Sequence, residues 1–327
     1  MTLFEPLARV LGGLTSPRGD GAKLTVLLYH HVLPRPDPLV PHEPDAAQFD
    51  AQLACLSRVF RVLSLEDGLR MLKLGTLPAR AVCITFDDGY RDNIEVAVPI
   101  LKRHGLTATF FIATGFLDGG MMMHDTVIEA VRRLPDGPCD LGWISLGQQL
   151  IGDTHSRVAL IDEFVRRVKY LPFQERADVC LRLAQGVHKQ LPTDLMMASD
   201  HVRQLLAEGM EVGAHTHNHP ILARLNPDEA SAQILKGRDT LTDLLGAAPT
   251  LFAFPNGKPN LDYGAEHVDL VKQAGFSAAV SVSMGTASRG SDHFQIPRFI
   301  PWDTDPRRLA LRILAHPHRH SDTMMAN

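Results

Sequence analysis

An uninterrupted run of apolar and β-branched residues, Ala81 to Phe86, ends directly on the acidic pair Asp87 and Asp88. Such a run predicts a buried strand, and Gly89 predicts the turn that ends it. α/β folds place their functional groups at the carboxyl ends of buried strands. Because side chains alternate across a strand, the two carboxylates are expected to point apart, one to bind a cation and one to transfer a proton. A turn with two solvated acids is the alternative interpretation.

Two histidines four residues apart, His215 and His219, follow much later in the chain. On a helical turn both imidazoles would project from one side. Two imidazoles, one carboxylate and a position open to water form a common catalytic zinc site. The zincin pattern H-E-x-x-H is excluded because Thr216 stands where its general-base glutamate would be, so Asp87 becomes the obvious base. Alone, such a pair is more often surface or core; together with the acidic strand end it favours a metal.

These two segments resemble the metal-dependent polysaccharide deacetylases of carbohydrate esterase family 4, which share the NodB homology domain. Residues 85–89 (T-F-D-D-G) match the first motif of that family, and residues 215–219 (H-T-H-N-H) match its H-[ST]-x-x-H motif. The resemblance covers residues 23–302, interrupted by a large insertion. It implies that Asp88, His215 and His219 hold a divalent metal, with Zn²⁺ favoured and Co²⁺, Ni²⁺ or Mn²⁺ as alternatives. It also implies that Asp87 is the catalytic base.

Such an enzyme hydrolyses the acetamide of an N-acetylated sugar to acetate and a free amine. A bound divalent cation polarises the carbonyl and lowers the pKa of water from 15.7 towards about 7. Asp87 is then expected to take the proton from the attacking water. The tetrahedral oxyanion needs donors, and the backbone N–H of Tyr90 is a candidate beside the metal.

The acid that protonates the leaving amine has two candidates. His316 fits the late L-x-H motif of the family, but the tail around it is rich in histidine and broken by proline, as in a frayed terminus. In some branches of the family a Y-H-x-V strand carries this histidine, and residues 29–32 fit that pattern. We therefore favour His30 over His316. The alternative for His30 is a packed strand-end histidine bonded to the backbone, and His31 alternates to the other face.

The chain departs from the family at the third motif, which usually supplies an arginine that orients the base. Ala253 stands at that position. Arg298 could fill the role from the next strand through a bidentate pair with Asp87. A surface arginine is the alternative interpretation.

Three residues near these motifs are candidates for contacts with a sugar. Phe254 and Asn256 belong to an F-P-N-G turn that is typical of a groove wall, and Trp302 follows shortly after Arg298. Either aromatic ring could instead be part of the core.

Strand and helix signals alternate along the chain, which predicts a parallel sheet covered by helices. The resemblance narrows this α/β pattern to a distorted, incomplete (β/α)7-type barrel. Residues 1–22 are expected to be an N-terminal segment, with a short amphipathic helix over 6–14, and residues 23–327 the NodB-like deacetylase domain. Among the expected helices, the one over residues 93–104 is made uncertain by Pro99.

The stretch from about 117 to 193 interrupts this alternation and is expected to be an inserted helical lobe beside the cleft. Its helix signals lie at 125–133, 156–170 and 173–190. At its entry, His124 and Asp125 either form a pair behind the site or Asp125 caps the following helix, and capping is favoured.

Composition restricts the environment and the partners. The formal net charge is −4 and no basic run is present, so nucleic acid is not an expected partner. The four cysteines lack a C-x-x-C spacing and indicate core residues in a reducing compartment. No segment reaches the ~20 apolar residues of a membrane span, and the N-terminus lacks the basic start of a signal peptide. We expect a cytoplasmic protein, with peripheral membrane contact through the N-terminal helix as an option; the oligomeric state is not specified.

Three functions follow from these observations. The favoured one is an N-deacetylase acting on an N-acetylated amino-sugar glycan or glycan precursor in envelope or exopolysaccharide synthesis. The second is a catalytically silent carbohydrate-binding relative, suggested by Ala253 and the uncertain acid. The third is a metal-dependent hydrolase of another amide, of the deformylase or cyclic-imide type. The product of the reaction distinguishes the first from the third.

Overall fold

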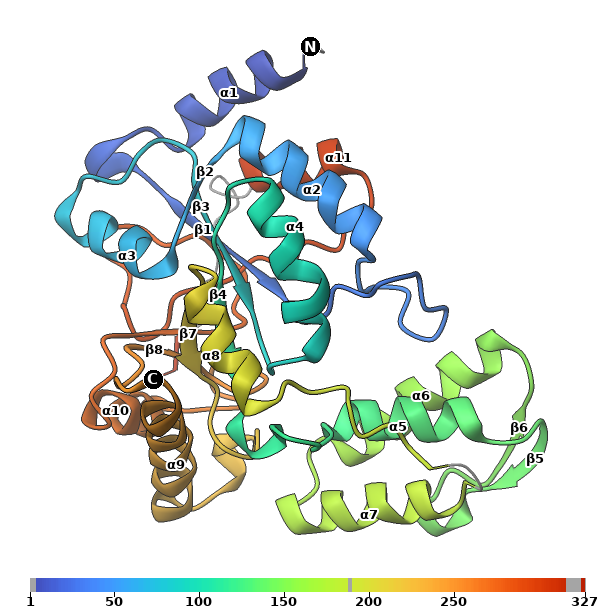
Figure 1. The fold of residues 1–327 in the computed structure, drawn as a ribbon. Coiled ribbons are helices and arrows are strands. Elements are labelled where there is room, and N and C mark those ends of the chain that lie inside the picture. Colours follow the sequence, from blue (N-terminus) through green and yellow to red (C-terminus); the bar gives the residue numbers. More distant parts are fainter. Residues whose placement is uncertain (1–3, 188–189, 316–324, 327) are drawn as a thin grey trace.

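A computed structural model describes residues 4–187, 190–315 and 325–326 of the chain. Its centre is a parallel sheet in the order β1-β3-β4-β7-β8-β9, with the short strand β2 paired to β3 (Figure 1). The strands of this sheet are β1 (Leu24–Tyr29), β2 (Arg61–Leu63), β3 (Ala81–Phe86), β4 (Thr109–Ile112), β7 (Glu211–Ala214), β8 (Leu251–Ala253) and β9 (Ala278–Val280).

Helices connect these strands and surround the sheet, as the strand–helix alternation predicts (Figure 1). They are α1 (Phe4–Thr15), α2 (Ala46–Val59), α3 (Leu65–Leu74), α4 (Val98–Arg103), α8 (Ser199–Ala207), α9 (Pro227–Leu245), α10 (Ala265–Gln273) and α11 (Pro306–Ala315). Polar side chains cap three of them at the N-terminus: Asp45 accepts a hydrogen bond from the backbone of Gln48, Ser64 from that of Asp67, and Asn226 from that of Glu229.

Alternate residues of the strands pack in two different clusters, because side chains alternate across a strand. In β3, Val82, Ile84 and Phe86 pack under the outer helices, whereas Ala81 and Cys83 pack with residues of β1, β8 and β9. The sheet therefore curves around an interior lined by the second set. Asp87 continues the inward-facing row of β3.

The barrel is incomplete between its first and last strands. No regular strand fills this position in the described residues; the irregular segment 296–299 spans it instead. The backbone N–H of Ser281 donates to the carbonyl of Ile296 at 2.8 Å, and that of Leu28 donates to Phe299 at 2.9 Å. The predicted incomplete barrel is thus confirmed, and its irregular closing segment carries Arg298.

The helix expected over 93–104 is divided. Residues Asn93–Ala97 form a single π-helical turn, and α4 begins directly after it at Val98. Pro99 causes the division, because it has no N–H to donate within a helix and is best placed in the first turn, where it now lies.

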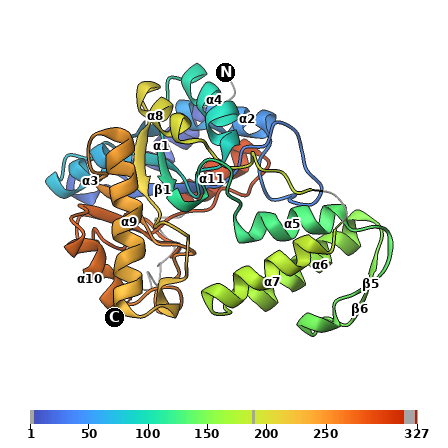
Figure 2. The ribbon, with the colours of Figure 1, turned by 60° about the horizontal axis from the view of Figure 1, so that its bottom comes forward.

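The stretch expected to be an insertion contains a helical lobe, which we define as α5 to α7 with the hairpin between α5 and α6. It contains α5 (Met123–Arg133), α6 (Thr154–Val168), α7 (Phe173–Gln185) and a hairpin of β5 (Gly137–Asp140) and β6 (Gln148–Ile151). Figure 2 shows the lobe extending to one side of the barrel. The lobe has its own hydrophobic cluster, in which Trp143 meets Phe164 edge to face. The hairpin was not predicted, because Gly137 and Pro138 are poor strand formers.

Asp125 does not cap α5, contrary to the expectation. Met122 occupies the N-cap position, and Asp125 lies in the first turn with its carboxylate buried. Asp125 Oδ1 lies 3.9 Å from His31 Nε2, so the carboxylate faces the barrel. It therefore links the helical lobe to the segment after β1.

No helix within the described ranges is both long and apolar enough to cross a membrane. All four cysteines are unpaired.

Candidate metal centre and active site

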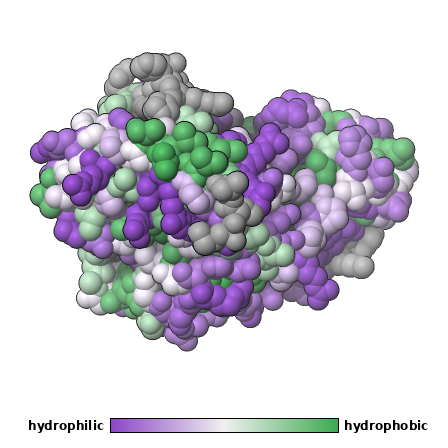
Figure 3. Space-filling view, turned by 90° about the horizontal axis from the view of Figure 1, so that it is seen from above, coloured by the Kyte–Doolittle hydropathy of each residue, from purple (hydrophilic) through white to green (hydrophobic). Residues whose placement is uncertain are grey.

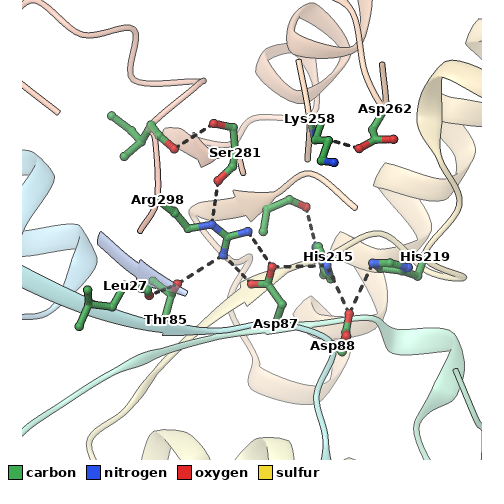
Figure 4. Close-up of polar contacts among 12 residues, drawn as sticks. Leu27, Thr85, Asp87, Asp88, His215, His219, Lys258, Asp262, Ser281 and Arg298 are labelled. Carbon is green, nitrogen blue, oxygen red and sulfur yellow. Dashed lines mark hydrogen bonds and ion pairs between the residues drawn. The ribbon is translucent and has the colours of Figure 1, made fainter. Parts of the chain in front are cut away.

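The residues singled out from the sequence meet at one edge of the sheet, because parallel strands bring their carboxyl ends together. Asp87 and Asp88 follow β3, His215 follows β7, and Ala253 ends β8. Arg298 enters the same region from the closing segment of the barrel. Figure 4 shows the side chains of Asp87, Asp88, His215 and Arg298 converging.

Asp87 and Arg298 form a bidentate ion pair inside the barrel. Arg298 Nη1 donates to Asp87 Oδ1 and Nη2 to Oδ2, both at 2.7 Å. The guanidinium is fixed by two further hydrogen bonds, from Nε to the carbonyl of Ser281 at 2.9 Å and from Nη1 to Thr85 Oγ1 at 3.3 Å. Arg298 is 1% exposed and Asp87 3% exposed, so the pair is shielded from water.

This pairing keeps the Asp87 carboxylate ionised. Burial alone disfavours the charged form, but Arg298, and then His215, outweigh it and hold the pKa of Asp87 below its usual value. Because Arg298 is buried, it is not the surface arginine of the alternative interpretation. Its role in catalysis remains a prediction.

Asp88 lies beyond the end of β3, and its carboxylate does not diverge from that of Asp87 as strand alternation predicted: Asp88 Oδ1 and Asp87 Oδ2 lie 3.5 Å and 3.8 Å from the same atom, His215 Nε2. Its backbone adopts a φ of +77°, a value uncommon for a residue other than glycine. Asp88 Oδ1 lies 3.5 Å from His215 Nε2 and 3.4 Å from His219 Nε2. This oxygen is buried and has no hydrogen-bond partner among the described residues, which is costly unless something binds there.

The two histidines face one another, but the segment between them is not the helical turn that the spacing suggested. Thr216 and His219 have positive φ values of 63° and 50°. The turn is closed by a hydrogen bond from the backbone N–H of His219 to Thr216 Oγ1 at 3.1 Å. Helix α9 packs directly behind it, because a Cβ on Gly237 would lie 2.7 Å from the Thr216 backbone.

Backbone contacts orient the ring of His215. Its Nδ1 donates to the carbonyl of Ala253 at 2.8 Å, which leaves Nε2 directed at Asp88. Ala253, which stands where the family has its arginine, thus serves the site through its carbonyl group. Behind His219, Arg176 of the helical lobe donates to the His219 carbonyl at 3.4 Å.

The residues present fit a divalent metal. The ligand atoms of Asp88, His215 and His219 all lie within 4.8 Å of one another. Two ligands at about 2.0–2.2 Å from one tetrahedral zinc ion lie roughly 3.3–3.6 Å apart, close to the separations from Asp88 Oδ1. An oxygen and two imidazole nitrogens are donors that zinc accepts.

The electrostatics of the site also favour a cation. Burial lowers the pKa of His219 to about 3, so this imidazole is neutral and able to ligate. Burial also disfavours protonated His215, but Asp87 and Asp88 outweigh it and raise the pKa of that ring. A positive charge between these carboxylates is therefore stabilised.

The two histidines after β1 have different surroundings. His30 is half-buried and is among the groups that lower the pKa of both Asp87 and Asp88, so it lies near the site. His31 instead stacks on the ring of Tyr90, with centroids 3.6 Å apart, and its Nδ1 lies 2.5 Å from Asp92 Oδ2. His316 lies outside the described residues.

The candidates for sugar contact have different surroundings. Phe254 is fully buried and stacks on Tyr263 with centroids 3.9 Å apart, so its ring offers no face to a sugar. Trp302 is 55% exposed and packs near the guanidinium of Arg312 on α11, in a hollow with Asp303 and Arg308. Asn256 is half-buried in the turn after β8, with a φ of +58°.

Several contributors were missed from the sequence. The carbonyls of Ser281 and Ala253 hold Arg298 and His215, and backbone acceptors leave no signal in a sequence. Thr85 was recognised as part of the strand and of the first motif, but not as a hydrogen-bond partner of Arg298.

The chain is similar in sequence to polysaccharide deacetylases. The family model described as polysaccharide deacetylase matches residues 75–147 and 176–279, more than half of the chain. YxkH of Bacillus subtilis (strain 168), which carries the name of that family, is 20% identical over 279 residues, covering 85% of this chain and 71% of its own. A poly-beta-1,6-N-acetyl-D-glucosamine N-deacetylase of Staphylococcus aureus is 41% identical over 70 residues, 21% of this chain and 24% of its own.

The fold is shared with a solved structure. The Streptococcus pyogenes deacetylase PplD, determined in complex with acetate, superposes with a TM-score of 0.61 at 20% identity, covering 89% of this chain and 98% of its own.

Proposed function

Because the chain belongs to the polysaccharide deacetylase family, we propose that it is a metal-dependent hydrolase that removes N-acetyl groups from an amino-sugar glycan or glycan precursor. The observation that carries this proposal is the position of the Asp87–Arg298 pair beside Asp88, His215 and His219. A buried carboxylate held ionised next to a set of metal ligands is what water activation requires.

Asp88, His215 and His219 are the proposed metal ligands, and Zn²⁺ is the proposed metal. Bound there, the metal would polarise the acetamide carbonyl and lower the pKa of water. The orphan Asp88 Oδ1 supports this assignment, because a metal would satisfy the buried oxygen. The carbonyl of Ala253 also supports the assignment, because its hydrogen bond with Nδ1 fixes the ring of His215.

Asp87 is the proposed general base. Its Oδ2 lies 3.8 Å from His215 Nε2, next to the proposed ligands. Arg298 orients the carboxylate and keeps it charged, so that it is ready to accept the proton of the attacking water. This arrangement replaces the arginine that the family places at position 253, and it removes one reason to infer a silent relative.

His30 is the proposed general acid. It lies near the same two carboxylates and is half-buried, which is compatible with a leaving amine reaching its ring. Its carbonyl accepts a hydrogen bond of 2.7 Å from Asn93 Nδ2, which fixes the backbone at this position. The backbone N–H of Tyr90, directly after the turn of Asp88 and Gly89, is the proposed donor to the oxyanion.

N-acetylglucosamine polymers are the proposed first substrates to test, because the curated deacetylase of Staphylococcus aureus that matches 70 residues of this chain is named for one. Residues 117–193 are proposed as an insertion that shapes access for the polymer. The hydrogen bond from Arg176 of the lobe to the carbonyl of His219 supports this proposal.

The test is acetate release from N-acetylglucosamine oligomers by zinc-loaded protein, with and without chelator. We expect chelator-sensitive release of acetate and of one free amine for each acetate. Release of formate or of a dicarboxylic acid from other amides, with none from the oligomers, would indicate an amide hydrolase of another kind. Binding of the oligomers without turnover at any metal loading would indicate a silent relative.

A further inference from the structure

Helix α1 is fixed to the barrel along one side. Ala8 is 2% exposed, and a Cβ on Gly12 would lie 2.6 Å from side-chain atoms of both Arg80 and Leu314. The Arg80 guanidinium also donates to the carbonyl of Arg9 at 3.1 Å. The small residues on this side therefore bring α1 against its neighbours.

Another side of the same helix presents large apolar side chains to solvent. Leu7 is 62% exposed, Val10 65%, Leu11 49% and Leu14 75%. Their spacing places them along one side of the helix. Figure 3 views the molecule from above, the side on which α1 lies, and shows a hydrophobic area bordered by hydrophilic residues. Scattered exposed leucines are ordinary, but a contiguous stripe marks an interaction surface.

Arginines gather around this stripe. Arg9 donates to the carbonyl of Arg58 at 2.6 Å, and Arg9 and Arg61 are both close enough to Arg80 to lower its pKa together with burial. Arg307 lies 5.9 Å from the ring centre of Phe4. Two acidic residues are described near these arginines. Glu5 lies 3.8 Å from Arg58, and Asp305 lies close to Cys55, as do Glu5, Arg58 and Arg307. Arg80 itself lies on the packed side of α1, so among the described residues four arginines (Arg9, Arg58, Arg61 and Arg307) lie near the helix with two carboxylates.

We propose that this face of α1 binds the surface of a bilayer that contains anionic lipid. An apolar stripe bordered by basic side chains is the pattern of a helix that lies in the interface, with its apolar side among the acyl chains. Arginine stems cover apolar surface while their guanidiniums reach the lipid phosphates. A protein partner could cover the exposed leucines equally well. The excess of arginine over acidic residues favours a negatively charged membrane surface instead.

The test is co-sedimentation of the full chain with vesicles of phosphatidylcholine alone and of phosphatidylcholine mixed with phosphatidylglycerol. We expect binding to the anionic vesicles that weakens with added salt. Leu14→Ser should weaken binding by about tenfold, as expected for one leucine withdrawn from burial. Leu150→Ser is the matched control, because Leu150 is also 75% exposed but lies in the hairpin of the helical lobe; it should bind like wild type.

The arginines are tested by Arg9→Gln with Arg61→Gln, compared with the exposed pair Arg166→Gln with Arg203→Gln. Only the first combination should reduce binding to anionic vesicles. Equal binding to neutral and anionic vesicles would overturn the electrostatic part of the proposal. Absence of vesicle binding by the wild-type chain would overturn the whole proposal. If sedimentation velocity shows a dimer that Leu14→Ser dissociates, the partner of this surface is a second copy of the chain. Acetate release from soluble oligomers should be unchanged in all these variants.

Discussion

Arg298 and Asp87 are 211 residues apart in the chain, yet two parallel hydrogen bonds of 2.7 Å join them inside the barrel. The arginine comes from the irregular segment that spans the gap between β9 and β1. A regular strand at this position would continue the sheet, whereas this segment is bonded through isolated bridges. The unfinished part of the barrel therefore supplies the cation that the proposed base requires.

Arg298→Met should destabilise the protein by about 3–5 kcal/mol, because it leaves the Asp87 carboxylate buried without its partner. The pKa of Asp87 should rise, so the acid limb of the pH–rate profile should move to higher pH. Urea unfolding and the profile of kcat/KM measure the two effects. Arg203→Met, which removes an exposed pair with Asp200, is the control and should cost at most about 1 kcal/mol. An unshifted acid limb in Arg298→Met would contradict the proposed role.

Asp87→Asn should lower kcat by about 10²–10⁴-fold while the protein still binds zinc. The change removes the proton acceptor but leaves Asp88, His215 and His219 in place. Asp88→Asn should instead lower the zinc content. Metal analysis of the two purified variants beside the rate of acetate release distinguishes them; wild-type activity in Asp87→Asn would show that the base is another group.

The stability of the metal-free protein should fall in acid as the Asp87–Arg298 pair is lost. The pKa of Asp87 is lower in the folded protein than the value near 3.9 of an unfolded chain. The pair's contribution is therefore fully present above about pH 4 and is lost as the pH falls through the folded-state value. Urea unfolding from pH 7 downwards should show a gap between wild type and Asp87→Asn that narrows only in this acid range. A constant gap at every pH would argue against ionic pairing.

Zinc should raise the unfolding temperature, because it binds the folded ligand set and satisfies the orphan oxygen of Asp88. At a free concentration of 100 Kd the expected stabilisation is about 2.7 kcal/mol. His219→Ala should abolish the rise. His217→Ala should keep it, since the His217 ring is paired with Thr114 Oγ1 at 2.9 Å and lies outside the ligand set. The experiment is thermal unfolding with and without zinc.

His30→Ala should lower kcat by about 10²–10⁴-fold without loss of zinc, as expected for a general acid. His316→Ala should have little effect. Single-turnover acetate release from both variants ranks the two histidines. The opposite ranking would return the role to the late motif of the chain.

The sequence predicted most of the strands and the set of residues at their ends, because a short, fully apolar run that stops on polar residues is typical of a buried strand. It did not predict the backbone of the site. Asp88, Thr216 and His219 all adopt positive φ values without being glycine, and such conformations are imposed by tertiary packing, as by α9 against Thr216.

The aromatic residues show the same limit. An F-P-N-G turn is equally compatible with a groove and with a core, and Phe254 is in the core because Tyr263 stacks on it. Asp125 looked like a helix cap from its local sequence, but its neighbour His31 comes from a distant strand end. Long-range partners decide such positions, and they leave no local pattern.

The helical lobe is packed around its own hydrophobic cluster, separate from the clusters of the barrel. A substitution inside that cluster is therefore felt first by the lobe itself, while the reacting groups rest on strand ends elsewhere. The sequences of the helical lobe and of the barrel can therefore diverge at different rates. Changes on the outer surface of the lobe can accumulate without altering the strand ends that carry Asp87, Asp88 and His215.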